Sequence, residues 1–169
     1  KQQGNGWKRK TIIRTGLKNT NKRCKSVSDI YARINLSKTN YRMSKSAVLF
    51  NNPPVDQIQE IYDQYCKYKQ FESVMPIFNE DLCAPHCDII GYYSNKELVA
   101  FSHYYWYNSD NVEAIQFAWN YKNPKLFLGL KSLRHECAYY KAKGVKYIYV
   151  GYADEYKKQI NGFEICPPR

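Results

Sequence analysis

The sequence predicts an α+β fold in which a mixed, mostly antiparallel sheet is flanked by helices. Residues 87–121 contain three runs of alternating, largely β-branched and aromatic side chains separated by polar turns, a pattern typical of an antiparallel meander. Residues 120–153 read as the end of a strand, a loop, a helix, a glycine stop and another strand. A doubly wound parallel sheet is excluded, because its strands and helices alternate throughout.

Local patterns place the individual elements along the chain. Asn52, Pro53 and Pro54 follow a short apolar run and favour the start of a helix, because apolar side chains then recur at helical spacing. In chain order we expect a strand at residues 46–51, a helix at 55–68, a loop with a short helix at 72–85, strands at 87–93, 97–107 and 112–121, a helix at 129–143 and a strand at 145–150.

The second helix is predicted by four side chains that recur at spacings of 3, 4 and 3 residues. These are Leu130, Leu133, Cys137 and Tyr140. Gly144 suits the left-handed residue that ends a helix. The first amides of a helix lack intrahelical partners, so a start near Gly129 is suited to binding a phosphate or another anion. Many α/β domains only bury such a unit, and that alternative stays open.

The positive charge of the chain is concentrated near its N-terminus. The net charge is +11, and residues 1–48 hold 13 of the 26 lysines and arginines but only one of the 15 acidic residues, Asp29. Such an excess of basic over acidic residues in one segment is typical of proteins that bind nucleic acid. The candidate contacts are Lys8, Arg9, Lys10, Arg14, Lys22, Arg23 and Lys25. A solubilising tail or a segment that contacts an anionic membrane surface are the alternatives.

The length of 169 residues indicates one domain with an extension. We place a basic N-terminal extension at residues 1–45 and the domain at residues 46–169. Residues 26–38 are expected to form a short helix or a turn-rich docking segment. No window is apolar enough to span a membrane, and the first residues lack the apolar core of a secretory signal. We therefore expect a cytoplasmic protein with reduced cysteines and no membrane partner.

Several short motifs, in order and spacing, resemble a known family. They are Leu128-Gly129, then the run SLRHE at residues 132–136, then Gly151-Tyr152. Together with residues 61–71 and 96–107, they are similar to the C-terminal domain of arginyl- and leucyl-tRNA–protein transferases, over residues 55–169. The resemblance implies a GNAT-like (acyl-CoA N-acyltransferase) fold. It also implies aminoacyl-tRNA as donor, a protein or peptide amine as acceptor, and no required cofactor.

The loop before the second predicted helix helps to distinguish between the possible acyl donors. GNAT acetyltransferases usually bind the pyrophosphate of CoA with a glycine-rich loop, whereas residues 122–130 (KNPKLFLGL) contain a single glycine. The candidate donor-binding residues are Lys122, Lys125, Gly129, Leu130, Lys131 and Ser132. The lone glycine favours aminoacyl-tRNA over acetyl-CoA. The alternatives are an acetyl-CoA-dependent N-acetyltransferase and a non-catalytic GNAT-like protein that binds nucleic acid or a partner.

Attack of an amine on an activated ester needs a group that takes up the proton of the amine and donors for the developing oxyanion. Backbone amides of two diverging strands, at residues 112–120 and 145–151, are expected to supply the donors. The candidate catalytic side chains are His103, in the middle strand, and Tyr152 and Asp154, after the last predicted strand, with Glu155 as the alternative to Asp154 as proton acceptor.

One cluster has the composition of a metal site. Cys83, His86 and Cys87 lie within five residues and offer soft ligands for zinc. No second Cys/His pair lies nearby to complete four ligands, and we therefore expect no metal.

Overall fold

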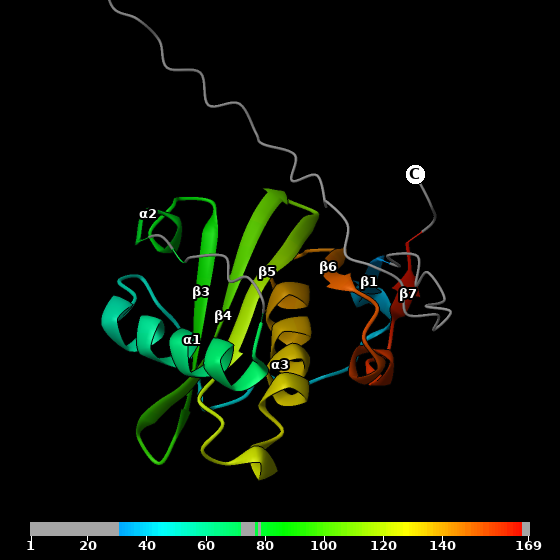
Figure 1. The fold of residues 1–169 in the computed structure, drawn as a ribbon. Coiled ribbons are helices and arrows are strands. Elements are labelled where there is room, and N and C mark those ends of the chain that lie inside the picture. The colour runs from blue at the N-terminus through cyan, green and yellow to red at the C-terminus, as the bar shows by residue number, and fades with distance from the viewer. Residues whose placement is uncertain (1–30, 72–76, 78, 167–169) are drawn as a thin grey trace, which may run out of the picture.

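The computed structural model describes residues 31–71, 77 and 79–166. Its centre is a seven-stranded sheet with the order β2-β3-β4-β5-β6-β1-β7 (Figure 1). The elements are β1 (Tyr31–Asn35), β2 (Ala47–Leu49), α1 (Val55–Lys69), α2 (Asn79–Leu82), β3 (Cys87–Ser94), β4 (Glu97–Asn108), β5 (Asn111–Trp119), α3 (Leu128–Ala142), β6 (Tyr147–Tyr152) and β7 (Phe163–Ile165), with the 3-10 turns η1 (Leu36–Lys38), η2 (Pro124–Leu126) and η3 (Glu155–Gln159).

The sheet is mixed and mostly antiparallel, as predicted. Among the strands that the structure describes, only β5 and β6 pair in parallel, and the helix α3 connects them. The meander β3-β4-β5 and both long helices lie where the sequence placed them. Helix α3 ends at Ala142 with Lys143 as its C-cap, and the Gly144 that follows has a φ of 86°, in the left-handed region that glycine adopts without strain.

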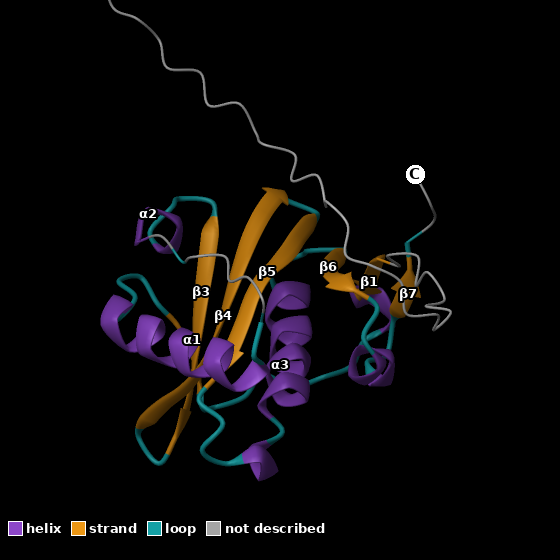
Figure 2. Ribbon diagram, viewed as in Figure 1, coloured by secondary structure: helices purple, strands orange, loops and turns teal. Residues whose placement is uncertain are grey.

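The helices cover opposite faces of the sheet. Successive residues of a strand point to opposite faces, and Ile89 and Ile90 of β3 belong to two separate hydrophobic clusters. The cluster of Ile90 contains Leu133, Cys137 and other residues of α3. The cluster of Ile89 contains residues of α1 and α2, and Figure 2 shows α1 crossing β3 and β4. The sheet therefore separates α3 from α1.

Strand β1 corrects the prediction for the segment before residue 46. We expected a short helix or a turn-rich segment, but residues 31–35 form a strand between β6 and β7. Ala32 and Ile34 alternate into the core and are almost fully buried, while Arg33 points to the other face. The partners of this strand come from residues 147–165, so nothing local in the sequence specifies the pairing.

The correction also changes the view of the N-terminal extension. Residues 31–35 are an integral part of the sheet, so the boundary that we placed at residue 45 cuts through the folded domain. Residues 1–30, with all seven candidate nucleic-acid contacts, lie outside the described residues.

The carboxylate of Glu164 on β7 forms hydrogen bonds with β1 and η1 at this end of the sheet. Glu164 accepts hydrogen bonds from Lys38 Nζ at 2.8 Å, Arg33 Nε at 3.1 Å and Asn35 Nδ2 at 3.2 Å. These contacts, with that of Lys38 the largest, lower the pKa of Glu164 from 4.5 to about 2. The carboxylate is therefore more stable in the folded chain than in the unfolded chain.

We expect this contribution to stability to be fully present above about pH 4.5 and to be lost as the pH falls toward 2, because the folded-state pKa lies below that of the unfolded chain. Its size is about 1 kcal/mol, since the pairs are partly exposed. Thermal unfolding between about pH 6 and pH 2.5 checks this. Wild type should lose more stability on acidification than Glu164→Gln, and parallel losses would show that the contact does not contribute.

Candidate active site between β5 and β6

Strands β5 and β6 diverge after a short stretch of pairing. Residues 111–113 of β5 pair with residues 147–149 of β6. Beyond this point β5 stays paired with β4, as far as Trp119 with Ala100, and β6 stays paired with β1, as far as Tyr152 with Tyr31. Each strand follows its outer neighbour, so the two strands separate as the sequence led us to expect.

A β-bulge marks the place where they part. His103 pairs with Gln116 and Tyr104 pairs with Ala114, so Ile115 is an extra residue in β5. Such a bulge bends its strand and increases the local twist. Backbone amides of residues 114–119 that face the gap then have no partner strand in β6. Amides of this kind are suitable donors for a developing oxyanion.

Helix α3 begins beside this divergence. Its first residue is Leu128, no side chain caps it, and its first turn contains no acidic residue. A methyl group added at Gly129 would lie 3.6 Å from the ring of Phe117 and 3.8 Å from that of Tyr156. The helix start therefore lies between the end of β5 and η3, which follows β6. Its first amides and positive dipole end favour an anion at this position.

Titratable side chains gather at the same place. Burial raises the pKa of Tyr65 to about 12, with smaller contributions from neighbours that include Tyr121 and Asp154. Burial and then the charge of Asp154 also raise the pKa of Tyr156. Asp154 directly precedes η3, two residues before Tyr156, and its carboxylate pairs with Lys157 Nζ at 2.7 Å. Both tyrosines stay protonated at neutral pH.

The three candidate catalytic residues lie in different places. Asp154 directly precedes η3, whose Tyr156 ring lies beside Gly129 at the start of α3. Tyr152 is 54% exposed and stacks on Tyr31, with ring centroids 5.2 Å apart. His103 is buried on the α1 face, because its neighbours Ser102 and Tyr104 both bond to α3. The sheet therefore separates His103 from the start of α3.

Most of the candidate donor-binding residues lie in or just before α3. Gly129, Leu130, Lys131 and Ser132 are in its first turns, and Lys131 is exposed. Ser132 is buried and donates its hydroxyl to the carbonyl of Gly129 at 3.2 Å, so it supports the helix start from behind. Lys125 is in η2, just before the helix.

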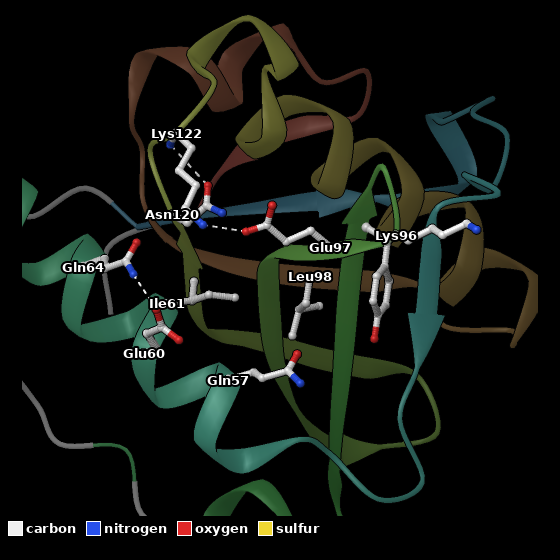
Figure 3. A pocket seen from close by; sticks show the side chains of 10 residues that line it. Gln57, Glu60, Ile61, Gln64, Lys96, Glu97, Leu98, Asn120 and Lys122 are labelled. Carbon is white, nitrogen blue, oxygen red and sulfur yellow. Dashed lines mark hydrogen bonds and ion pairs between the residues drawn. The ribbon is translucent and has the colours of Figure 1, made fainter.

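Lys122 lies apart from this group. Its Nζ is 2.5 Å from Glu97 Oε1, and the pair borders a hollow of about 370 Å³ between α1 and the β3-β4 turn (Figure 3). The hollow is lined by Gln57, Glu60, Ile61, Gln64, Tyr93, Lys96, Glu97, Leu98, Asn120 and Lys122. Most of the residues that line it are polar, and one of them, Gln57, belongs to the first turn of α1.

Glu136 and Tyr156 were missed by the sequence reasoning. Glu136 is 2% exposed and accepts hydrogen bonds from the hydroxyls of Tyr92 at 2.6 Å, Tyr104 at 2.5 Å and Ser102. Burial raises its pKa, and the three hydrogen bonds oppose that shift. The signal was an acidic residue four positions after Ser132 on the buried face of a helix, opposite strands with hydroxyl side chains.

The cysteine cluster forms no site in the described residues. No three His, Cys, Asp or Glu side chains in the described part come close enough together to hold a metal ion. Neither Cys83 nor Cys87 forms a disulfide with another cysteine of the described residues. No helix within residues 31–71 and 79–166 combines the length and apolar character needed to cross a membrane.

Comparisons with solved structures decide the fold. A putative GNAT acetyltransferase from Novosphingobium aromaticivorans superposes with a TM-score of 0.62 at 12% identity, over 81% of this chain and 59% of that chain. L-PGS from Bacillus licheniformis gives 0.56 at 16% identity, over 74% and 46%. This chain has a GNAT acyltransferase fold. It spans less than half of the length of L-PGS.

Further comparisons concern the cofactor and the family of the chain. Saccharomyces cerevisiae N-myristoyltransferase with bound myristoyl-CoA gives a TM-score of 0.51 at 8% identity, over 72% of this chain and 41% of that chain. The expectation that no cofactor is required therefore has no support among these GNAT structures. No family model and no curated protein sequence matches the chain. The finer resemblance to arginyl- and leucyl-tRNA–protein transferases stays a prediction.

Proposed function

We propose that the protein is an N-acyltransferase that transfers an acyl group from a phosphate-containing donor to an amine. The divergence of β5 and β6 beside the uncapped start of α3 carries this proposal. In this proposal the first amides of α3 bind the donor phosphate, β5 amides bind the oxyanion, and Asp154 and Tyr156 transfer the protons. The GNAT fold shared with acyltransferases supports the same conclusion.

The side chains present suit each step of the reaction. The amine nitrogen attacks the carbonyl carbon of the donor ester, and β5 amides stabilise the resulting oxyanion. Asp154 takes the proton that the amine loses, and Lys157 holds its carboxylate in place. The carbon–oxygen bond of the ester then breaks, and the new carbon–nitrogen bond remains. Tyr156 donates its proton to the leaving oxygen. Asp154 passes the proton that it took from the amine to Tyr156.

Aminoacyl-tRNA is the donor that we favour, with a protein or peptide amine as acceptor. Residues 120–127, which precede α3, contain no glycine, and Gly129 is the second residue of the helix, so no glycine-rich pyrophosphate cradle precedes α3. The C-terminal domain of a putative lysylphosphatidylglycerol synthetase from Agrobacterium fabrum has a similar fold, with a TM-score of 0.59 at 10% identity over 74% of this chain and 46% of that chain. That similarity is consistent with an aminoacyl donor. An acyl-CoA donor is the alternative, supported by the fold of the myristoyl-CoA complex.

A transfer assay tests the proposal. Labelled aminoacyl-tRNA and labelled acetyl-CoA are each incubated with the full chain and a peptide amine. We expect transfer from aminoacyl-tRNA, and about a 100-fold loss of kcat/KM in Asp154→Asn, because a general base contributes about that factor. Glu155→Gln is the matched control, since Glu155 is exposed and pairs with Lys158. Transfer from neither donor, or equal losses in both variants, would contradict the proposal.

A further inference from the structure

One segment of the chain crosses the sheet beside α3 and joins two distant strands. Residues 39–46, which we call the strap, run from η1, next to β1, to β2 at the far edge of the sheet (Figure 1). Strands β3, β4, β5 and β6 lie between β1 and β2 in the sheet. The strap itself forms neither helix nor strand, so its position depends on the side chains that contact it.

Two polar side chains of α3 bond to the backbone of the strap. Lys141 Nζ donates to the carbonyl of Thr39. His135 Nδ1 accepts the backbone N–H of Ser44 at 2.9 Å. An imidazole nitrogen accepts a hydrogen bond only while it carries no proton, so the neutral ring has its proton on Nε2. A second proton, on Nδ1, would face the Ser44 N–H and set donor against donor.

The surroundings of His135 are aromatic and dry. The residue is 7% exposed, and burial lowers the pKa of its imidazole below the ordinary value of 6.5. Its ring meets that of Tyr92 on β3 edge to face, with the centroids 5.9 Å apart. On α3 it stacks with the ring of Tyr139 at 6.2 Å. These contacts suit the neutral ring.

The charged groups on the elements around His135 do not compensate a positive charge there. They are Arg42 and Lys45 of the strap, Asp88 of β3, and Lys131, Arg134, Glu136 and Lys141 of α3. The carboxylates of Asp88 and Glu136 accept hydrogen bonds from tyrosine hydroxyls. Within the described ranges, neither carboxylate forms an ion pair with His135. A protonated His135 is therefore a buried cation without a counter-ion, which is costly.

The strap also holds the chain that follows η3. The Tyr41 hydroxyl accepts the N–H of Asn161 at 2.8 Å, and the Arg134 guanidinium lies 5.7 Å from the centroid of the Tyr41 ring. Asn161 comes two residues after the end of η3, which contains Tyr156. A displaced strap therefore removes a contact next to η3.

We propose that His135 is a pH-sensitive contact that holds the strap on α3 and releases it when Nδ1 is protonated. Because the pKa of His135 is lower in the closed fold than in the unfolded chain, the contact contributes fully above about pH 6.5. Its contribution is lost as the pH falls below that value toward the folded-state pKa. This role of His135 is independent of the proposed function, because it needs neither donor nor acceptor.

Amide hydrogen exchange of the full, isotope-labelled chain, followed by NMR, tests the inference. Each rate is divided by the intrinsic rate of an unfolded peptide at the same pH. In wild type, the corrected exchange of the Ser44 amide should be about 10-fold or more faster at about pH 5 than at about pH 7.5. The reason is that each pH unit below an open-state pKa of about 6.5 raises the open population by up to about tenfold. The Cys137 amide, within α3, should not change.

Two variants separate this contact from other effects of acid. His135→Asn places an oxygen near the position of Nδ1 that accepts the same N–H without titrating, so its corrected Ser44 exchange should be equal at both pH values. His86→Asn changes an exposed histidine before β3 and should keep the response of wild type. In wild type alone, the Ser44 amide and the His135 ring should titrate with one midpoint, which provides a test even if a variant does not fold.

Four results would overturn the inference. They are equal corrected exchange of the Ser44 amide at both pH values, a response of His135→Asn like that of wild type, an equal acceleration at the Cys137 amide, and different midpoints for Ser44 and His135. Equal acceleration at Cys137 would show that acid opens the whole domain and not the strap. The measurement needs no catalysis, so its outcome is separate from that of the transfer assay.

Discussion

Glu136→Leu is expected to lower the free energy of unfolding by about 3–5 kcal/mol, because it leaves three buried hydroxyls without their acceptor. Glu136 joins α3 to both β3 and β4 through Tyr92, Tyr104 and Ser102. Leucine fills a similar volume, so the loss reports on the hydrogen bonds and not on a cavity. Urea unfolding followed by far-UV circular dichroism measures the change.

Matched variants separate this network from a general packing defect. Adding Tyr92→Phe, Ser102→Ala and Tyr104→Phe to Glu136→Leu removes the orphaned hydroxyls and should restore much of the lost stability. Glu136→Gln keeps an acceptor and should cost less. If the combined variant is as unstable as the sum of the single changes, the hydroxyls do not act through Glu136.

The pH dependence of Glu136 has the opposite sign to that of Glu164. Burial raises the folded-state pKa of Glu136 above 4.5, so the folded chain binds its proton more tightly than the unfolded chain does. Its contribution to stability is therefore greatest below about pH 4.5 and declines as the pH rises through the folded-state value. The stability of Glu136→Gln relative to wild type should increase over that rise.

Gly129→Asp is expected to weaken binding of the donor by about 10-fold or more, because a carboxylate at the helix start competes with the donor phosphate for the same amides and dipole. The fold should survive. A new side chain at this position makes only ordinary contacts with Phe117 and Tyr156, and an acidic residue in the first turn stabilises a helix.

Gly129→Ala is the control, since it adds a methyl group in the same place without a charge. It should bind the donor as wild type does and be slightly more stable than wild type, because glycine is a poor helix former. Calorimetry with aminoacyl-tRNA and with acetyl-CoA gives the affinities, and thermal unfolding gives the stabilities. Similar donor affinities of the two variants would show that the helix start is not the anion site.

Local periodicity was sufficient to predict the elements that hold the candidate site. The alternation of residues 97–107 predicted β4, and the spacing of Leu130, Leu133 and Cys137 predicted α3 to within one residue at its start. The divergence of β5 and β6 was also expected, at residues 112–120 and 145–151.

The features that were missed depend on contacts between distant parts of the chain. Strand β1 is five residues long and contains Arg33 and Asn35, so its alternation is too short to distinguish it from a loop. Lys122 was assigned to the donor because of its position before α3, but Glu97, 25 residues earlier, holds it elsewhere. Glu136 was also missed because its role depends on distant residues, since its three hydrogen-bond donors come from two strands.

Photo-cross-linking tests the central claim most directly, namely that the acyl group of the donor lies where β5 and β6 part, beside the start of α3. A donor analogue that carries a diazirine on its acyl chain is irradiated with the full chain, and the modified peptides are identified by mass spectrometry. We expect labels within residues 114–119 and at the first turn of α3, and fewer labels in Gly129→Asp than in Gly129→Ala. Labels confined to the hollow beside Lys122 would contradict the claim and move the acyl site to the α1 face of the sheet.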